Sequence, residues 1–394
     1  MNILFISAIL PYPLYSGGQV RIYNLLKQLS KEHTITLFSF IRSNEEKKYV
    51  KELSFLKETR VFLRGKVWQV PYVLRALTSP LPLLMASYEN RQMKQALVEE
   101  MKNNQYNLIH IEPFYVFPVL PSDCTLPLVV AEHNIEYEVY NSYVDQFRIP
   151  CMRPLLGVDV NKIRFQEEHV WQKAAKIIAV SDHDMSVIQK TSKKDIVSFV
   201  PNGVDTKEFR VSKKSFTDHT KRILFVGNFL WMPNVKAMET LIDDIWPVVK
   251  KVMPDVTLTV VGKHLPSHLE KKVKIMGATY DPFVDDIREI YAASDVLLAP
   301  MTIAGGTKFK ILEAMASGCI VITTKEGIEG IDANPDIHYL RVETPVDVVT
   351  ALQHVYGNPK KSQQMAQTAR KFIETHYDWN AIAKKQSLVW KEAV

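Results

Sequence analysis

The 394-residue sequence has only three cysteines, and Cys124, Cys151 and Cys319 lie far apart in the chain. Their odd number and wide spacing predict neither a disulfide framework nor a structural zinc site, and they favour a reducing compartment. Long apolar runs are also missing, so no segment is predicted to span a membrane. The apolar segment 1–10 lacks a basic leader and stops at Pro11, which indicates a buried strand rather than a signal peptide.

Motifs for several classes of ligand are absent as well. No G-x-G-x-x-G follows the first predicted strand, which counts against dinucleotide binding, and no G-x-x-x-x-G-K-[ST] occurs, which counts against a P-loop. No nucleic-acid-binding motif accompanies the basic residues. The chain has no repeats, and 46% hydrophobic with 23% charged residues is typical of a globular protein. Its length indicates two domains.

Short apolar runs alternate with helical patterns along both halves of the chain. This βα alternation predicts parallel, doubly wound sheets, which bind ligands at the carboxyl ends of their strands. Between the two series, Pro-Asn-Gly-Val-Asp at 201–205 supplies turn residues and predicts a domain boundary. The runs in the first half are 3–8, 34–40, 108–111, 128–131, 177–180 and 196–200; those in the second half are 223–228, 256–261, 273–276, 296–299 and 320–323.

The stretch 305–318, between two of these runs, has the residues of an anion site. It begins with Gly-Gly-Thr, and glycines before a helix let the backbone approach a ligand closely. The first amide groups of a helix lack intrahelical partners and carry partial positive charge. Lys308 and Lys310 are predicted in the first turn, where cations oppose the dipole unless an anion compensates. Glu313 can accept hydrogen bonds from hydroxyl groups. The alternative is a simple loop with an N-cap.

Polar residues also follow predicted strands in the first half. Gly17 and Gly18 stand before an amphipathic helix, as in a second phosphate-binding turn. Glu112 follows the run 108–111, and His133 follows the run 128–131. Because the carboxyl ends of parallel strands meet at one edge, these side chains are candidates for a site, although a single histidine is more often a structural hydrogen-bonding residue.

Two aspartates, Asp182 and Asp184, have the spacing of a metal-binding Asp-x-Asp pair. They directly follow a predicted strand and Ser181, and acidic residues are favourable in the first turn of a helix. We therefore interpret this segment as a helix N-terminus, and no metal ligand is predicted.

The strings at 17–18, 201–205 and 305–318 resemble those of family-4 glycosyltransferases, in a Gly-Gly-Thr-Lys-x-Lys variant. The resemblance covers nearly the whole chain. It implies a GT-B fold, an α/β architecture of two doubly wound, Rossmann-like domains that face a central cleft. Residues 1–204 would form the acceptor-side domain, with a C-terminal helix at about 376–394 crossing back onto it, and 205–375 the donor domain.

The resemblance also implies roles for single residues. His133 and Lys308 would be catalytic, and Arg21 and Glu112 would lie on the acceptor side. Two residues depart from the family pattern: Gly305 stands where a first Glu is usual, and Asn228 replaces the Arg of a Val-Gly-Arg turn, unless it is only a turn residue. We infer that the lysines then hold the diphosphate. The implied donor-binding residues are Gly17, Gly18, Gly227, Asn228, Gly305, Gly306, Thr307, Lys308, Lys310 and Glu313.

The implied function is a metal-independent, retaining transfer of a sugar from a nucleotide diphosphate-sugar to a glycan or lipid-linked acceptor in cell-surface polysaccharide synthesis. A nucleotide-sugar epimerase of the same fold, or an inactive nucleotide-sugar or glycan-binding protein, are the alternatives. No cofactor and no nucleic acid partner is expected.

The net charge of +6 is concentrated in one segment. Residues 47–75 hold eight Lys or Arg and two Glu, an excess of six that equals that of the whole chain. Apolar residues lie between and after these charges, up to residue 85. The segment 47–85 is therefore either a solvated face over ordinary core or a surface for anionic lipid or an anionic acceptor. The expected location is cytoplasmic, with or without peripheral attachment to the inner membrane face.

Overall fold

The computed structural model describes residues 1–145, 147, 149–210, 214, 216, 221–303 and 306–394. The chain forms two compact units, one of Met1–Val200 with Ile382–Val394 and one of Pro201–Ala381. Each unit has its own parallel sheet, which confirms the predicted α/β class. The three cysteines are all in the thiol form.

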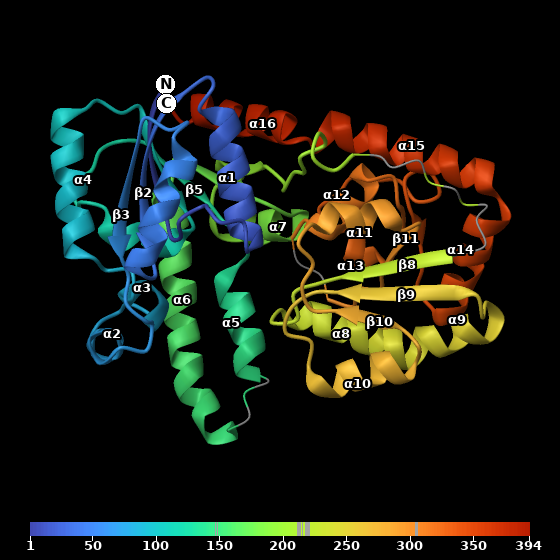
Figure 1. Cartoon of the computed structure of the whole chain (residues 1–394). Coiled ribbons are helices and arrows are strands. Elements are labelled where there is room, and N and C mark those ends of the chain that lie inside the picture. Colours follow the sequence, from blue (N-terminus) through green and yellow to red (C-terminus); the bar gives the residue numbers. More distant parts are fainter. Residues whose placement is uncertain (146, 148, 211–213, 215, 217–220, 304–305) are drawn as a thin grey trace. The chain divides into compact units, whose positions relative to one another are not determined.

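The first unit contains a seven-stranded sheet of order β3-β2-β1-β4-β5-β6-β7 (Figure 1). All neighbouring strands are parallel. The central strands are buried along nearly their whole length, as expected for a parallel sheet covered on both faces. The chain reverses its winding between β1 and β4, which is where such sheets bind ligands. The strands are β1 (Asn2–Ser7), β2 (Thr34–Ile41), β3 (Glu58–Leu63), β4 (Leu108–Glu112), β5 (Leu128–Ala131), β6 (Lys176–Ala179) and β7 (Val197–Phe199).

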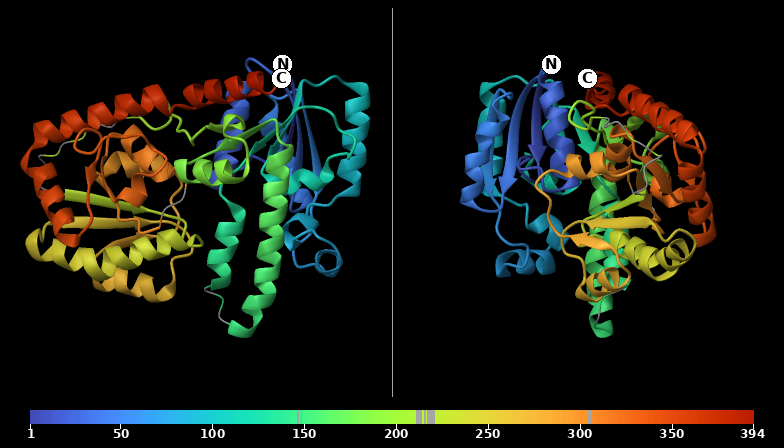
Figure 2. Two further views of the ribbon diagram at one scale, coloured as in Figure 1. Left: turned by 180° about the vertical axis from the view of Figure 1, so that it is seen from behind. Right: turned by 45° about the vertical axis from the view of Figure 1, so that its right-hand side comes forward.

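Helices pack around this sheet, and two of them, α5 and α6, extend past it as a pair (Figure 2). Glu167 of α6 accepts hydrogen bonds from the backbone amides of Glu136 and Tyr137, at the start of α5. The helices of this unit are α1 (Gly17–Leu29), η1 (Asn44–Leu53), α2 (Val70–Thr78), α3 (Leu83–Ala86), α4 (Arg91–Asn103), η2 (Phe114–Val119), α5 (Glu136–Asp145), η3 (Pro150–Met152), α6 (Arg153–Lys173), α7 (Asp182–Thr191) and η4 (Lys194–Ile196).

The C-terminal helix α16 (Trp379–Glu392) completes the core of the first unit. Trp390 is fully buried, and its ring lies edge-on to those of His33 and His110. Ser387 lies 2.8 Å from His33, between Oγ and Nε2, and Glu392 forms an ion pair with Lys176. The last turns of the chain are therefore part of the first unit.

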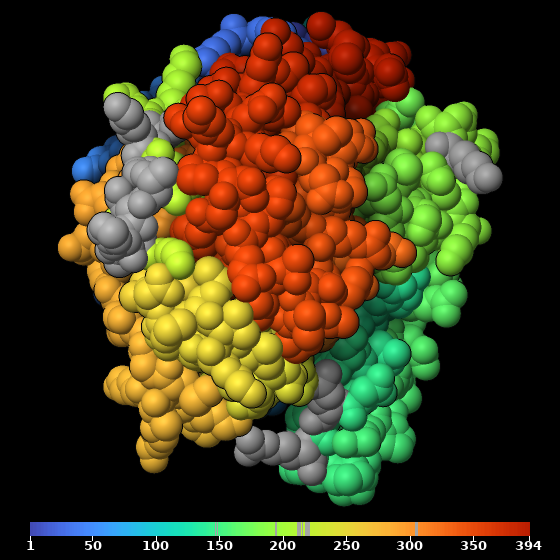
Figure 3. Space-filling view, turned by 90° about the vertical axis from the view of Figure 1, so that its right-hand side faces the viewer, coloured from blue at the N-terminus to red at the C-terminus, as the bar shows by residue number. Residues whose placement is uncertain are grey.

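The second unit contains a six-stranded parallel sheet of order β10-β9-β8-β11-β12-β13. The strands are β8 (Lys221–Val226), β9 (Val256–Val261), β10 (Thr279–Asp281), β11 (Val296–Ala299), β12 (Ile320–Thr323) and β13 (Leu340–Arg341). The helices are α8 (Met232–Thr240), η5 (Leu241–Ile245), α9 (Trp246–Val252), α10 (Ser267–Ile275), α11 (Ile287–Ala293), α12 (Phe309–Ala316), α13 (Lys325–Ile328), α14 (Pro345–Gly357) and α15 (Pro359–His376). Helices α14 and α15 form much of the surface that faces the viewer in Figure 3.

One predicted strand is wrong. The apolar run 273–276 belongs mainly to α10, and the strand comes later, at Thr279–Asp281. Leu269 and Val273 are four residues apart and both fully buried, so they form one face of a helix that packs on the sheet. Within the described residues, no helix combines the length and apolar character needed to cross a bilayer.

Candidate functional site

Three predicted residues of the first unit meet at the carboxyl ends of β4 and β5. Glu112 ends β4 and is fully buried, and His133 follows β5 by two residues with its side chain 21% exposed. The Nε2 atom of His133 lies 2.5 Å from Oε1 of Glu112. Arg21, buried on α1, donates from Nε to the same oxygen at 3.2 Å. The structure thus brings these three side chains into one hydrogen-bonded group.

A fourth member of this group is His110, which sequence analysis missed. Its Nε2 lies 3.2 Å from Oε2 of Glu112. Burial alone would raise the pKa of Glu112, but the hydrogen bonds of His110 and His133 and the charge of Arg21 lower it well below its usual range. Glu112 is therefore ionised at neutral pH although no part of it reaches solvent.

The glycine pair begins α1 and lies against this group. Ser16 is the N-cap of the helix, and its hydroxyl accepts a hydrogen bond from the amide of Gln19. A Cβ atom at Gly18 would lie 3.0 Å from both Cε1 and Nδ1 of His133. Gly18 thus leaves room beside the Nδ1 edge of the imidazole, at the N-terminus of a helix where anions are stabilised.

In the second unit, Lys310 is held near the carboxyl end of β8. Its Nζ donates to Oδ1 of Asn234 at 2.7 Å and lies over the ring of Phe225, 4.7 Å from the centroid. Burial, and then the charge of Lys308, lower the pKa of Lys310 to about 7. A lysine in this state gains a full charge when an anion binds beside it.

Glu313, one turn further along α12, has the opposite shift. The hydroxyl of the fully buried Tyr291 donates to its Oε2 at 2.9 Å. Burial raises the pKa of Glu313 to about 7, against the effects of this hydrogen bond and of Lys310. Groups with strongly shifted pKa values gather at functional sites, so Lys310 and Glu313 mark the candidate ligand site of this unit.

The start of α12 differs from the prediction. The helix begins at Phe309, so Lys308 is its N-cap residue and only Lys310 lies in the first turn. Nζ of Lys308 lies 3.2 Å from the carbonyl of Gly306, which has a φ of +58°. Thr307 is buried and donates its hydroxyl to the carbonyl of Gly330. Gly305 lies outside the described residues.

Gly227 and Asn228 follow β8 and connect to Lys310 through Asn234. The Asn234 side-chain amide donates to the carbonyl of Asn228 at 2.8 Å, while its oxygen accepts from Lys310. A Cβ atom at Gly227 would lie 2.9 Å from Cγ of Asn234. Gly262, directly after β9, has even less room for a side chain, because a Cβ atom there would lie 1.7 Å from the Gly227 carbonyl oxygen. Asn234 therefore joins two predicted segments, although the sequence analysis did not identify it.

The segment 181–184 has the predicted structural role. Ser181 is the N-cap of α7, its hydroxyl accepts from the amide of Asp184 and donates to the carboxylate of the same residue. Asp184 is buried in this arrangement. In the part of the chain that the structure describes, no group of three or more His, Cys, Asp or Glu side chains is arranged to hold a metal ion.

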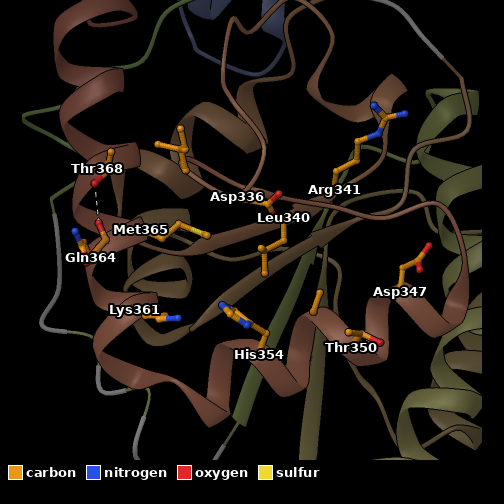
Figure 4. A pocket seen from close by; sticks show the side chains of 12 residues that line it. Asp336, Leu340, Arg341, Asp347, Thr350, His354, Lys361, Gln364, Met365 and Thr368 are labelled. Atoms are coloured by element: carbon orange, nitrogen blue, oxygen red, sulfur yellow. Dashed lines mark hydrogen bonds between the residues drawn. The ribbon is translucent and has the colours of Figure 1, made fainter.

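A separate groove of about 730 Å³ lies in the second unit between α14, α15 and the edge strand β13 (Figure 4). Two of its charged groups serve the local structure, since Arg341 pairs with Glu343 and Asp347 forms the capping box of α14. It shares no residue with the group around Lys310. The groove is lined by Asp336, Ile337, Leu340, Arg341, Asp347, Thr350, Ala351, His354, Lys361, Gln364, Met365 and Thr368.

Both halves of the chain match models of glycosyltransferase families. Residues 15–208 match glycosyltransferase family 4, and residues 220–358 match glycosyl transferases group 1. A Klebsiella pneumoniae protein described as an uncharacterized 44.6 kDa protein in the cps region is 22% identical over 396 residues, which is 96% of each chain.

Solved structures share the fold at low sequence identity. Anabaena Alr3699/HepE in complex with UDP-glucose is 16% identical over 98% of each chain, with a TM-score of 0.66. WaaG, a glycosyltransferase involved in lipopolysaccharide biosynthesis, is 15% identical over 98% of this chain and 99% of its own, with a TM-score of 0.63. These similarities confirm a GT-B fold with two Rossmann-like domains.

The buried charge of Glu112 yields a prediction on stability. Glu112→Gln should lower the free energy of unfolding of the first unit by about 3–5 kcal/mol, because the buried guanidinium of Arg21 then loses the carboxylate of its ion pair. Glu392→Gln removes the carboxylate of an exposed pair and should cost about 1 kcal/mol or less. Urea unfolding of both variants measures the difference, and equal losses would contradict the role of Glu112.

Glu112→Gln also tests how the stability of the protein depends on pH. Because the pKa of Glu112 is depressed in the folded state, its contribution is present above the unfolded-state pKa of about 4.3 and is lost as the pH falls below it. The gap in stability between wild type and Glu112→Gln should therefore narrow on acidification.

Proposed function

The chain carries a glycosyltransferase family 4 domain followed by a glycosyltransferase group 1 domain, and we propose that it transfers a sugar, with retention of configuration, from a nucleotide diphosphate-sugar to a glycan or lipid-linked acceptor. The observation that carries the proposal is the pair Lys310 and Glu313 on α12, a half-buried cation and carboxylate three residues apart with pKa values near 7. Such a pair can hold a diphosphate and a hydroxyl-bearing ribose at once.

The donor occupies the second unit in this proposal. The diphosphate lies beside Lys308, Lys310 and the amides at the start of α12, and Glu313 accepts from the ribose hydroxyls. Backbone close to the ligand is provided by Gly227 and Gly306. The binding of UDP-glucose by the related fold of HepE supports this choice of donor class.

The leaving nucleotide is stabilised by fixed positive groups. Cleavage of the glycosidic bond places negative charge on the diphosphate, and preorganised donors lower the energy of that charge in the transition state. Lys308, Lys310 and the α12 amides provide these donors, so the reaction proceeds without a metal ion or other cofactor.

His133 contacts the transferred sugar and is the catalytic residue of the first unit. Arg21 and Glu112 are buried, so they hold His133 in place rather than touch the acceptor themselves. Gly17 and Gly18 begin α1, and Gly18 leaves room beside the histidine for the donor phosphate.

The segment 47–85 attaches the enzyme to an anionic membrane surface. Helix α2 exposes apolar side chains, with Trp68 before it 74% exposed and Leu74 and Leu77 55% and 65% exposed. Nζ of Lys162 on α6 donates to the carbonyl of Ala76 and so fixes α2 with these residues outward. An amphipathic helix within a basic segment is suited to anionic lipid. This places the enzyme at the inner membrane face, where a lipid-linked acceptor would be within reach.

The first test of this function uses a panel of nucleotide diphosphate-sugars with a lipid extract as acceptor, and products are read by mass spectrometry and NMR. Wild type should form a glycoside with the donor's anomeric configuration and remain active in EDTA. His133→Ala should lower kcat by about 10²–10³, the loss of one preorganised polar contact, while UDP affinity stays unchanged. An inverted product, an epimerised donor or a fully active variant would contradict the proposal.

A second test concerns the charge of Lys310. At about pH 8 the lysine is largely neutral and the diphosphate fully ionised, so binding of UDP should take up close to one proton. Affinity should accordingly fall by up to about tenfold per pH unit above pH 7. Calorimetry in two buffers of different ionisation enthalpy measures the uptake.

Two lysine variants provide the control for this test. Lys310→Met should abolish the proton uptake and weaken binding about tenfold or more, because a charge-assisted hydrogen bond is lost. Lys308→Met should weaken binding and keep part of the uptake, since Lys310 remains buried but loses the neighbouring charge that also lowers its pKa. Uptake that survives in Lys310→Met would assign it to another group.

The membrane assignment is tested with vesicles of phosphatidylcholine, with and without an equal part of phosphatidylglycerol. The protein should sediment with the anionic vesicles, and Leu74→Ser with Leu77→Ser should reduce binding at least about tenfold, since each buried leucine contributes about 1.5–3 kcal/mol. Ile275→Ser, at an exposed apolar residue of the second unit, is the matched control. Equal binding by both variants would show that α2 is not part of the membrane-binding surface.

A further inference from the structure

A chain of hydrogen bonds leads from the C-terminal helix to His133. The indole Nε1 of Trp390 donates to Nδ1 of His110 at 3.1 Å. Nε2 of His110 lies 3.2 Å from Oε2 of Glu112, and the other carboxylate oxygen lies 2.5 Å from Nε2 of His133. All members except His133 are fully buried, and all four belong to the first unit.

The chemistry of the first member determines the protonation of the others. An indole N–H can only donate, so Nδ1 of His110 is an acceptor and carries no hydrogen. The hydrogen of the neutral ring is then on Nε2 and donates to Glu112. Protonation of His110 would place two N–H groups against each other, so Trp390 keeps His110 neutral, in agreement with the pKa of His110, which burial lowers.

The consequence for His133 follows from the carboxylate. An ionised carboxylate only accepts hydrogen bonds, so His133 donates through Nε2, and its Nδ1 is the nitrogen that faces Gly18. When His110 is neutral, it does not form an ion pair with Glu112, and the negative charge of Glu112 remains available to Arg21 and His133. A protonated His110 would compete for that charge and weaken the hold on the catalytic histidine.

We propose that Trp390 is a positioning residue for sugar transfer, whose indole N–H fixes the tautomer of His110 and thereby keeps Glu112 available to orient His133. The inference rests on the proposed function. Carboxylates that fix a catalytic imidazole in one tautomer have large effects on rate without contacting substrate. Here the carboxylate itself depends on the tautomer of His110, which is fixed by Trp390 on helix α16.

The test is Trp390→Phe in the full-length protein, assayed with whichever donor the panel shows to be turned over. It should lower kcat about tenfold, the equivalent of one lost hydrogen bond, and leave the donor KM within about twofold. The loss should grow as the pH falls from about 8 to 6, because His110 can now take up a proton. The charged or titratable groups that face His110 are Glu112 on its own strand, Arg21 on α1, His133 after β5 and, beyond Trp390, His33.

A conservative second substitution separates this role from a merely structural one. In Trp390→Phe with His110→Gln, the glutamine amide still donates to Glu112 but cannot be protonated, so the extra loss at low pH should disappear. Trp246→Phe removes an equally buried indole that donates to the carbonyl of Met276 in the second unit, and it should leave kcat unchanged. A loss that is the same at every pH, or the same in Trp246→Phe, would overturn the proposal.

Nitrogen NMR of the labelled wild-type protein tests the relay without any substrate. His110 should show a protonated Nε2 and an unprotonated Nδ1, and a hydrogen on Nδ1 would overturn the inference. The activity assays separate failure of the proposed function from failure of the inference about Trp390. A wild-type protein without transferase activity contradicts the proposed function, whereas an active wild type with an equally active Trp390→Phe contradicts only the role of Trp390.

Discussion

The first unit depends on stabilising one ionised carboxylate, that of Glu112, which has no contact with solvent. Glu112 can keep its charge only because three side chains donate to it, and each comes from a different part of the chain or sheet. Helix α1 supplies Arg21, β4 supplies His110 and the segment after β5 supplies His133. Three pieces of the fold must therefore be in register before the charge is stable, and the histidine at the rim gains a fixed orientation as a result.

In the second unit, the charges of the site residues are not fixed in advance. Lys310 and Glu313 are half-buried, but both have pKa values near 7, so their charges are not fixed before a ligand arrives. Their uncharged partners Asn234 and Tyr291 hold the side chains in position without determining their protonation. The first unit thus has a preset charge, while the second has groups whose charge adjusts to an anion.

The sequence predicted the two parallel sheets because buried parallel strands are continuous apolar runs, and it placed Glu112 and His133 together because parallel strands end at one edge. It failed at 273–276, where four apolar or basic residues fit a helix or a strand equally well. His110 carried a usable signal, since it stands two residues before Glu112 and residues two apart on a strand share a face. Trp390, Asn234 and Tyr291 carried none, because their contacts depend on which helix packs where.

Helix α16 has a consequence for the order of synthesis. Its first residues belong to the second unit and its last turns to the first. Domains commonly fold as they emerge from the ribosome, N-terminal domain first. Here residues 1–200 emerge first but lack one wall of their core until residues 382–394 have been made. The unit whose synthesis begins first is therefore completed only after the whole of the second unit has emerged.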